Sequence, residues 1–207
     1  MTGIEAVVFD VGETLVDETS AWEAWADHLG VPRFTFMAIL GAIVSHGQDH
    51  RRIFEVLGSG VAPTADPPGW ERSEDDLYPD AVPTIQALVE HRVRVGVVGN
   101  QAAATGGFFA DLGLPLELIG TSQAWGVAKP DPAFFARIAA ELELPPATIA
   151  YVGDRFDNDV RPAIEAGMVG VLIRRGPWAI WDALDLEESR ADVTIDSLEE
   201  LLAEVRD

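Results

Sequence analysis

The 207-residue chain contains no cysteine and only one lysine, and this composition limits its chemistry. Without cysteine it has neither a disulfide framework nor a thiolate metal site, and a cysteine nucleophile is excluded. Of its 14 basic residues, all but Lys129 are arginine. A solitary lysine can arise by chance, or it can mark a position that needs a compact ammonium group where a planar guanidinium would not fit.

Positive charge is scarce overall. The 35 acidic residues give a formal net charge of −21, which opposes binding to nucleic-acid phosphates and anionic lipids. The longest strongly apolar run, residues 34–44, is shorter than the about 18 to 20 residues of a membrane span. The N-terminus lacks the basic region and apolar core of a signal peptide. We therefore expect a cytoplasmic monomer or homodimer with no nucleic-acid or membrane partner.

The chain does contain a regular alternation of apolar runs and helical patterns. Most of the apolar runs are continuous, as in strands that are covered on both faces. The expected strands are 4–10, 93–100, 116–120, 148–154 and 169–175. The expected helices between them are 80–92, 102–114, 131–144 and 158–168. This alternation predicts an α/β fold with a doubly wound, Rossmann-like parallel sheet.

Residues 18–78 interrupt this alternation, because they contain helical patterns and no convincing strand. We expect two domains: a core formed by residues 1–17 and 79–207, and a small helical cap domain, residues 18–78, inserted after the first strand. His46, His50, Arg51 and Arg52 of the insertion could face a site at the strand ends, although a solvated helix surface is a sufficient role for most of them. A cap in this place would exclude water and select the substrate.

Polar residues stand at the carboxyl ends of three expected strands, where ligands bind in such sheets. They are Asp10, Asn100 and Asp154. A single aspartate at a strand end is commonly a turn or cap residue. Their recurrence within longer motifs argues for a shared site.

Four segments together resemble the haloacid dehalogenase superfamily. They are "VVFDVGETLVD", "VGVVGNQ", "GVAKPDPAFF" and "IAYVGDRFDNDVRPAIEAGM", which occur in the family's order from residue 6 to about 175. The resemblance implies that Asp10 is a nucleophile and that Lys129 pairs with it and with a transferring phosphoryl group. It also implies a Mg²⁺ ion held by Asp10, Asp154 and the backbone carbonyl of Gly12.

The chemistry agrees with these residue types. A carboxylate attacks phosphorus only if the repulsion between the two anions is offset, which a magnesium ion and an ammonium group achieve. By resemblance, Asp159 supports the lysine or a metal-bound water. Thr14 is expected either to hydrogen-bond within the first loop or to serve its turn alone. We expect Asp157 to cap the following helix, and Arg155 is a candidate for binding an anion.

Two residues depart from the family's pattern. Related phosphatases carry a second aspartate two residues after the nucleophile, as general acid and base, where this chain has Gly12. Loss of a positioned acid or base typically removes about 100 to 10,000-fold in rate. Glu13 is adjacent but should point in another direction. The second departure is Gly99, which replaces a phosphoryl-binding Ser or Thr, so that Asn100 or a backbone N–H would have to supply that hydrogen bond.

Three functions remain. The first is a magnesium-dependent phosphatase that acts on a small phosphorylated metabolite through an aspartyl phosphate. The second is a dehalogenase or phosphonatase, since these enzymes also lack the second aspartate. Metal-free dehalogenases do not need the acidic loop kept here, and the insertion lacks the lysine of a phosphonatase. The third is a non-catalytic regulatory module that binds a metal or phosphate.

Overall fold

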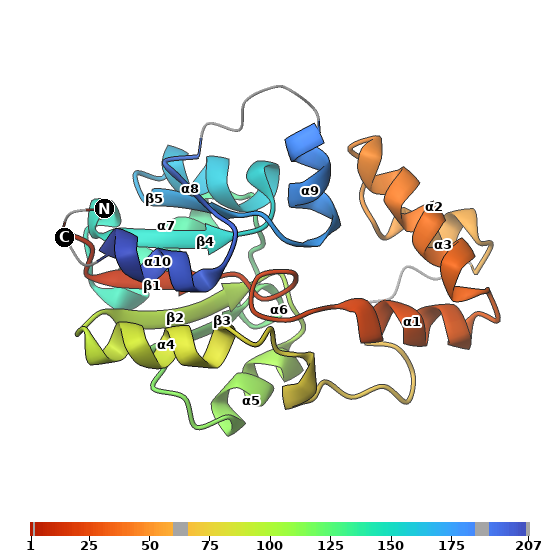
Figure 1. Cartoon of the computed structure of the whole chain (residues 1–207), viewed down its shortest axis with the longest axis horizontal. Coiled ribbons are helices and arrows are strands. Elements are labelled where there is room, and N and C mark those ends of the chain that lie inside the picture. Colours follow the sequence, from red (N-terminus) through yellow and green to blue (C-terminus); the bar gives the residue numbers. More distant parts are fainter. Residues whose placement is uncertain (2, 60–65, 185–190, 206–207) are drawn as a thin grey trace.

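The structure, a computed structural model, describes residues 1, 3–59, 66–184 and 191–205. Its centre is a parallel sheet of six strands in the order β3-β2-β1-β4-β5-β6 (Figure 1). The strands are β1 Ala6–Phe9, β2 Arg94–Gly99, β3 Leu118–Thr121, β4 Ile149–Gly153, β5 Val169–Ile173 and β6 Val193–Ile195. The order reverses at β1, which pairs with both β2 and β4. Such a reversal is the usual ligand-binding position in a doubly wound sheet.

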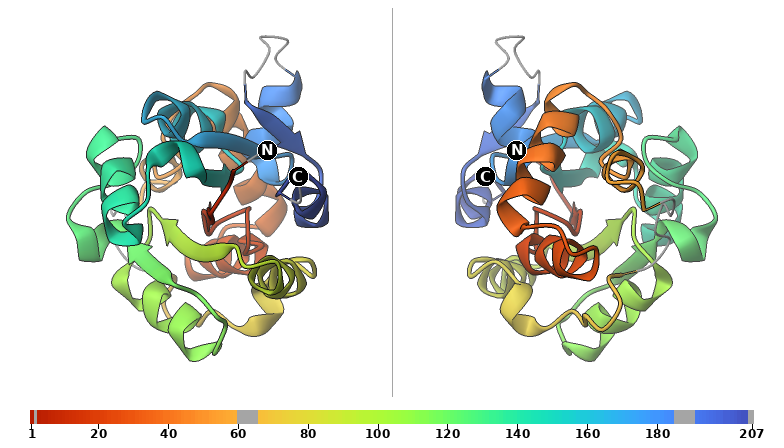
Figure 2. Two further views of the ribbon diagram at one scale, coloured as in Figure 1. Left: turned by 90° about the vertical axis from the view of Figure 1, so that its left-hand side faces the viewer. Right: turned by 90° about the vertical axis from the view of Figure 1, so that its right-hand side faces the viewer.

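Helices cover both faces of the sheet, as the view along the strands shows (Figure 2). The helices of the chain are α1 Thr19–His28, α2 Arg33–Ser45, α3 Arg52–Val56, α4 Ala81–Glu90, α5 Ala103–Asp111, α6 Ser122–Trp125, α7 Pro132–Leu142, α8 Arg161–Glu165, α9 Gly176–Leu184 and α10 Leu198–Val205. The continuous apolar runs of the strands are explained by this double cover. In β1, Val7 and Phe9 join a cluster with α4, α5 and α10, whereas Ala6 and Val8 join a second cluster with α7 and α8.

The segment between β1 and α4 forms a separate group of helices, α1 to α3, beyond the carboxyl ends of the strands (Figure 1). These helices have an apolar cluster of their own, which includes Phe36, Ile53 and Phe54 and is flanked by Trp22 and Trp25. No single helix in the described ranges is long and apolar enough to cross a membrane; only α1 and α2 taken together, bent by 115°, have the length and composition.

The predicted α/β class and the five predicted strands are confirmed. The sequence analysis missed β6 and the helices α6, α9 and α10. A strand of three residues such as β6 is too short to show a hydrophobic period, and it becomes a strand by pairing with β5 at the edge of the sheet. The fourth predicted helix begins as a π-helical turn, Phe156–Val160, before α8.

Candidate active site at the strand ends

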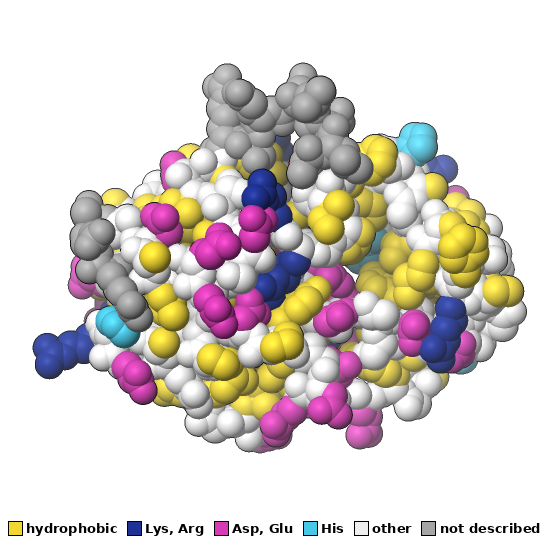
Figure 3. All heavy atoms as spheres, in the orientation of Figure 1, with side chains coloured by type: hydrophobic (Ala, Val, Ile, Leu, Met, Phe, Trp, Pro, Cys, Tyr) yellow, Lys and Arg dark blue, Asp and Glu magenta, His cyan; other side chains and the backbone are white. Residues whose placement is uncertain are grey.

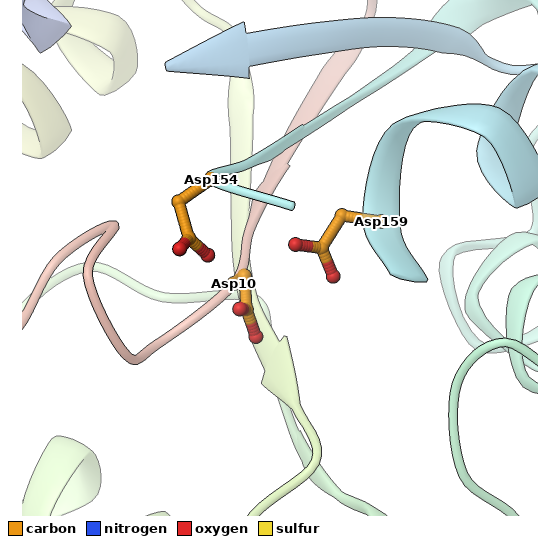
Figure 4. A group of neighbouring side chains, drawn as sticks. All are labelled: Asp10, Asp154 and Asp159. Carbon is orange, nitrogen blue, oxygen red and sulfur yellow. The ribbon is translucent and has the colours of Figure 1, made fainter. Parts of the chain in front are cut away.

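The site lies at the reversal of the sheet. Asp10 directly follows β1 and Asp154 directly follows β4, and because these strands are paired, the two side chains come together. Asp159 approaches from the π-helical turn after β4, and its carboxylate points toward the other two (Figure 4). All three carboxylates are buried. The parallel pairing of the strands thus brings together residues that are far apart in the sequence, with Asp10 and Asp159 separated by 149 positions.

Lys129, in the segment between α6 and α7, lies between two of these carboxylates. Its Nζ is 2.6 Å from Oδ1 of Asp10 and 2.5 Å from Oδ1 of Asp159. The ammonium also lies 5.4 Å from the ring centre of Tyr151, whose hydroxyl donates a hydrogen bond to the carbonyl of Val98. Only 1% of the lysine side chain is exposed. The only lysine of the chain is therefore enclosed in a space that suits a compact ammonium.

The charges of the site are not balanced by the residues present. Burial raises the pKa of Asp10 to about 6, with Lys129 opposing the rise and Asp159 adding to it. Burial and the neighbouring anions of Asp159 and Asp10 raise the pKa of Asp154 well above its usual range. Burial disfavours the charged form of Lys129, but Asp10 and Asp159 hold its pKa well above the usual value. One ammonium thus faces three carboxylates, and a further cation would stabilise their anions.

The donor set fits a divalent cation. One carboxylate oxygen from each of Asp10, Asp154 and Asp159 can be chosen so that all three lie within 4.8 Å of one another. Oδ2 of Asp154 is buried and accepts no hydrogen bond from the described residues, which is costly unless a ligand is bound there. Oxygen donors of this kind suit Mg²⁺. The residues present therefore match the expected ion.

Asn100 holds the backbone of Lys129 from both sides. Its Oδ1 accepts a hydrogen bond from the lysine N–H at 2.8 Å, and its Nδ2 donates to the lysine carbonyl at 2.9 Å. At the neighbouring Gly99, a Cβ would lie 2.6 Å from Oδ1 of Asp10, so a side chain there would require the Asp10 carboxylate to shift. The glycine that replaces the family's Ser or Thr thus gives room to the Asp10 carboxylate.

Three further expectations have different outcomes. The Thr14 hydroxyl is buried and makes no hydrogen bond to the described residues, so of the two roles expected for Thr14 the one in the turn remains. The expectation that Asp157 caps a helix is wrong, because it lies inside the π-helical turn and pairs with Arg155 at 2.9 Å. Arg155 does line the cavity beside the site, and its guanidinium lies 5.5 Å from the ring centre of Trp178.

A cavity of about 650 Å³ opens beside Asp10 and Asp154 and extends to α1, to α3 and to the segment between α2 and α3. A recess is visible between these helices and the rest of the molecule in Figure 3. Of the four basic residues that could face the site, His50 and Arg51 line it, whereas His46 and Arg52 are not among its lining residues. The His50 ring lies edge-on to Trp22 and Trp178, at 5.7 and 5.6 Å between ring centres. Burial lowers the pKa of His50 to about 4, so this wall presents a neutral imidazole.

Glu18 and Arg72 are among the charged residues that line the same cavity and that were not predicted from the sequence. Burial and repulsion by Glu13 raise the pKa of Glu18 to about 7, with Arg72 opposing the rise. Arg72 donates to the hydroxyl of Thr105 at 3.3 Å, while its buried Nε has no partner among the described residues. Neither residue stands in a recognisable motif, since each reaches the cavity from a connection between the helices and the sheet.

The comparison with known proteins agrees with this geometry. The sequence profile of the haloacid dehalogenase-like hydrolases matches residues 4–167. The chain belongs to this family. The haloacid dehalogenase-like chain is 29% identical to the glyceraldehyde 3-phosphate phosphatase of Methanopyrus kandleri, in an alignment that spans 99% of this chain and 98% of that protein.

Solved structures of the family show the same fold. A HAD phosphatase from Thermococcus onnurineus has a TM-score of 0.63 at 21% identity, with 96% of each chain covered. The L-2-haloacid dehalogenase from Xanthobacter autotrophicus, with chloropropionic acid covalently bound, has a TM-score of 0.65 at 20% identity, with 97% of each chain covered. Because a phosphatase and a dehalogenase are about equally similar, the fold alone does not select the reaction.

Proposed function

We propose that the protein is a magnesium-dependent phosphatase that hydrolyses a small phosphorylated metabolite through an aspartyl phosphate on Asp10. The observation that carries this proposal is the Lys129 ammonium held between Asp10 and Asp159, beside the unpartnered oxygen of Asp154. Such a site neutralises negative charge around a nucleophilic carboxylate. That is what an attack on a phosphate dianion requires.

Each residue has a distinct part in this proposal. Asp10 forms the bond to phosphorus while the ester oxygen leaves. Lys129 balances charge on Asp10 and on the transferring group, and Asp159 holds the ammonium in place. Asp10, Asp154 and the carbonyl of Gly12 would hold Mg²⁺, which supplies positive charge to the phosphoryl oxygens when bound.

We further propose that residues 18–78 act as a cap that closes over the substrate. Trp22, His50 and Arg51 line the cavity from this segment, opposite Asp10 and Asp154. The cavity of about 650 Å³ suits a small metabolite better than a polymer. The name of the Methanopyrus kandleri relative makes glyceraldehyde 3-phosphate the first substrate to test.

The acidic cluster favours this reaction over dehalogenation. Asp154 and Asp159 form with Asp10 a group that could hold a metal ion, which a metal-free dehalogenase does not need. Gly12 favours the remaining alternative, a module that binds metal and phosphate without turnover. Hydrolysis that depends on Asp10 would distinguish the phosphatase from this binding module.

The direct test is a release assay on phosphate esters, a phosphonate and a 2-haloacid with Mg²⁺, using Asp10→Asn as the blank. We expect phosphate release from esters that disappears in the blank. Halide release in place of phosphate would overturn the reaction class. Equal signals from the protein and the blank on every substrate would leave only the binding module.

Metal binding is tested separately by calorimetry. Titration of Mg²⁺ into the native protein should give binding that is weakened about 10-fold or more in Asp154→Asn, because the variant loses a charged ligand. Asp111→Asn, a change at an exposed carboxylate at the end of α5, is the matched control. Identical isotherms for the native protein and Asp154→Asn would reject the metal site.

A further inference from the structure

The space beside Gly12 is already filled by a carboxyl group from elsewhere in the chain. A Cβ built on Gly12 would lie 2.5 Å from Oε1, 2.7 Å from Cδ and 3.1 Å from Oε2 of Glu18. In an aspartate, ordinary bond lengths place each carboxylate oxygen about 2.4 Å from its own Cβ. Oε1 of Glu18 therefore lies at the distance from this point that an aspartate oxygen at position 12 would have.

We propose that Glu18 is the proton donor and acceptor of the reaction and acts from the position that a side chain at residue 12 would take. The inference rests on the proposed phosphatase function, and it adds a catalytic residue to that site. Glu18 lines the same cavity as Asp10, Gly12 and Lys129. The absence of a side chain at Gly12 leaves room for this arrangement, because a Cβ there would push the Glu18 carboxyl group out of its position.

The first loop is built to bring Glu18 to this place. The chain turns back after Asp10, with the Glu13 N–H bonded to the Val16 carbonyl at 2.7 Å and the Val16 N–H bonded to the Val11 carbonyl at 3.0 Å. Glu13 adopts a φ of +52°, a conformation that few residues other than glycine take. The loop therefore brings the start of α1 over residue 12.

Glu13 is a positioning residue in this loop and is not a competing proton donor. One of its carboxylate oxygens accepts the Tyr78 hydroxyl at 2.7 Å, and the other accepts the Glu18 N–H at 3.2 Å. Both oxygens are thus engaged in holding the loop. The Glu18 carboxyl group is contacted by Gln101 and faces the cavity.

The two steps balance with Glu18 in this role. In the first, the Asp10 carboxylate bonds to phosphorus, the P–O bond to the leaving group breaks, and the Glu18 carboxylic acid gives its proton to the departing oxygen. In the second, a water attacks the aspartyl phosphate and gives a proton to the Glu18 carboxylate. Inorganic phosphate leaves, Asp10 is free, and Glu18 is again protonated.

The test compares an alkyl phosphate, whose leaving group needs a proton, with 4-nitrophenyl phosphate, whose leaving group does not. The value of kcat/KM reports only the steps up to loss of the leaving group. Glu18→Gln should lower kcat/KM for the alkyl ester by about 100-fold or more and change that for the aryl ester by only a few-fold. With the aryl ester, the variant should release one equivalent of nitrophenol in a burst, because the second step is slowed.

Two further variants separate this role from a structural one. Glu18→Ala should show the same split between esters, and adding Gly12→Asp to Glu18→Ala should restore alkyl ester hydrolysis, because an aspartate then fits the vacated space. Glu23→Gln, on the helix α1 that follows Glu18 and paired with Arg33 away from the cavity, is the matched control and should behave as the native protein.

The failures of the two proposals are distinguishable. If the native protein hydrolyses both esters and Glu18→Gln lowers both equally or neither, the role of Glu18 is overturned and the phosphatase stands. If Gly12→Asp fails to restore alkyl ester hydrolysis in a variant with a native-like melting curve, the equivalence of the two positions is overturned. If the native protein hydrolyses neither ester, the proposed function itself falls, and the role of Glu18 with it.

Discussion

Replacing Asp10 with asparagine should stabilise the protein in the absence of metal. Asp10 is 8% exposed, and its pKa of about 6 stands above the ordinary value of 3.8. The folded state therefore binds the proton more tightly than the unfolded state, so the charged Asp10 opposes folding above pH 6, and this opposition disappears as the pH falls below 3.8. At pH 8, the difference between these two pKa values corresponds to a loss of about 3 kcal/mol in the free energy of unfolding. Asp10→Asn removes the charge and keeps the shape, while Lys129 retains Asp159 as a partner.

The assay is urea denaturation with a chelator at pH 8 and near pH 4, with Asp111→Asn as the control for the loss of one acidic charge. We expect Asp10→Asn to unfold at higher urea concentration than the native protein at pH 8 and at about the same concentration near pH 4. Added Mg²⁺ should reduce the advantage at pH 8, because it stabilises the native carboxylates. If Asp10→Asn is equally or less stable than the native protein at pH 8 without metal, the burial argument is refuted.

The remaining predictions concern fit and pairing. Lys129→Arg should lower kcat/KM about 100-fold or more, since a guanidinium cannot occupy the enclosed space without displacing Asp10; retained rates would show that charge alone suffices. Gly99→Ser should also lower the rate in steady-state assays, because its Cβ would meet Oδ1 of Asp10; an unchanged or higher rate would contradict this. Arg175→Ala should lower the free energy of unfolding by about 3 kcal/mol in urea titrations, because the half-buried Asp80 loses its bidentate partner; a change below about 1 kcal/mol would show that this ion pair contributes little.

The positions of the five main strands and their parallel pairing could be predicted from the sequence, because their apolar runs are long and polar residues mark the ends of several of them. Asp10, Asn100 and Asp154 stand at such ends, and the parallel pairing of the strands brings them together. The edge strand β6 and the helix α9 could not be predicted from the sequence. Their local patterns are too short, and only packing against β5 and the neighbouring loops selects their conformation.

The sequence alone was enough to recognise the family and to predict Asp10, Lys129 and Asp154 as site residues, because a fixed order of motifs at strand ends leaves few alternatives. It also showed that an acid was missing at Gly12. What occupies that space was decided only by the tertiary structure. The loop from Val11 to Val16 turns the chain back by hydrogen bonds between backbone groups, which carry no residue signature. Glu18 consequently comes to lie beside Gly12 in space, although nothing in its sequence context distinguishes it from other surface glutamates.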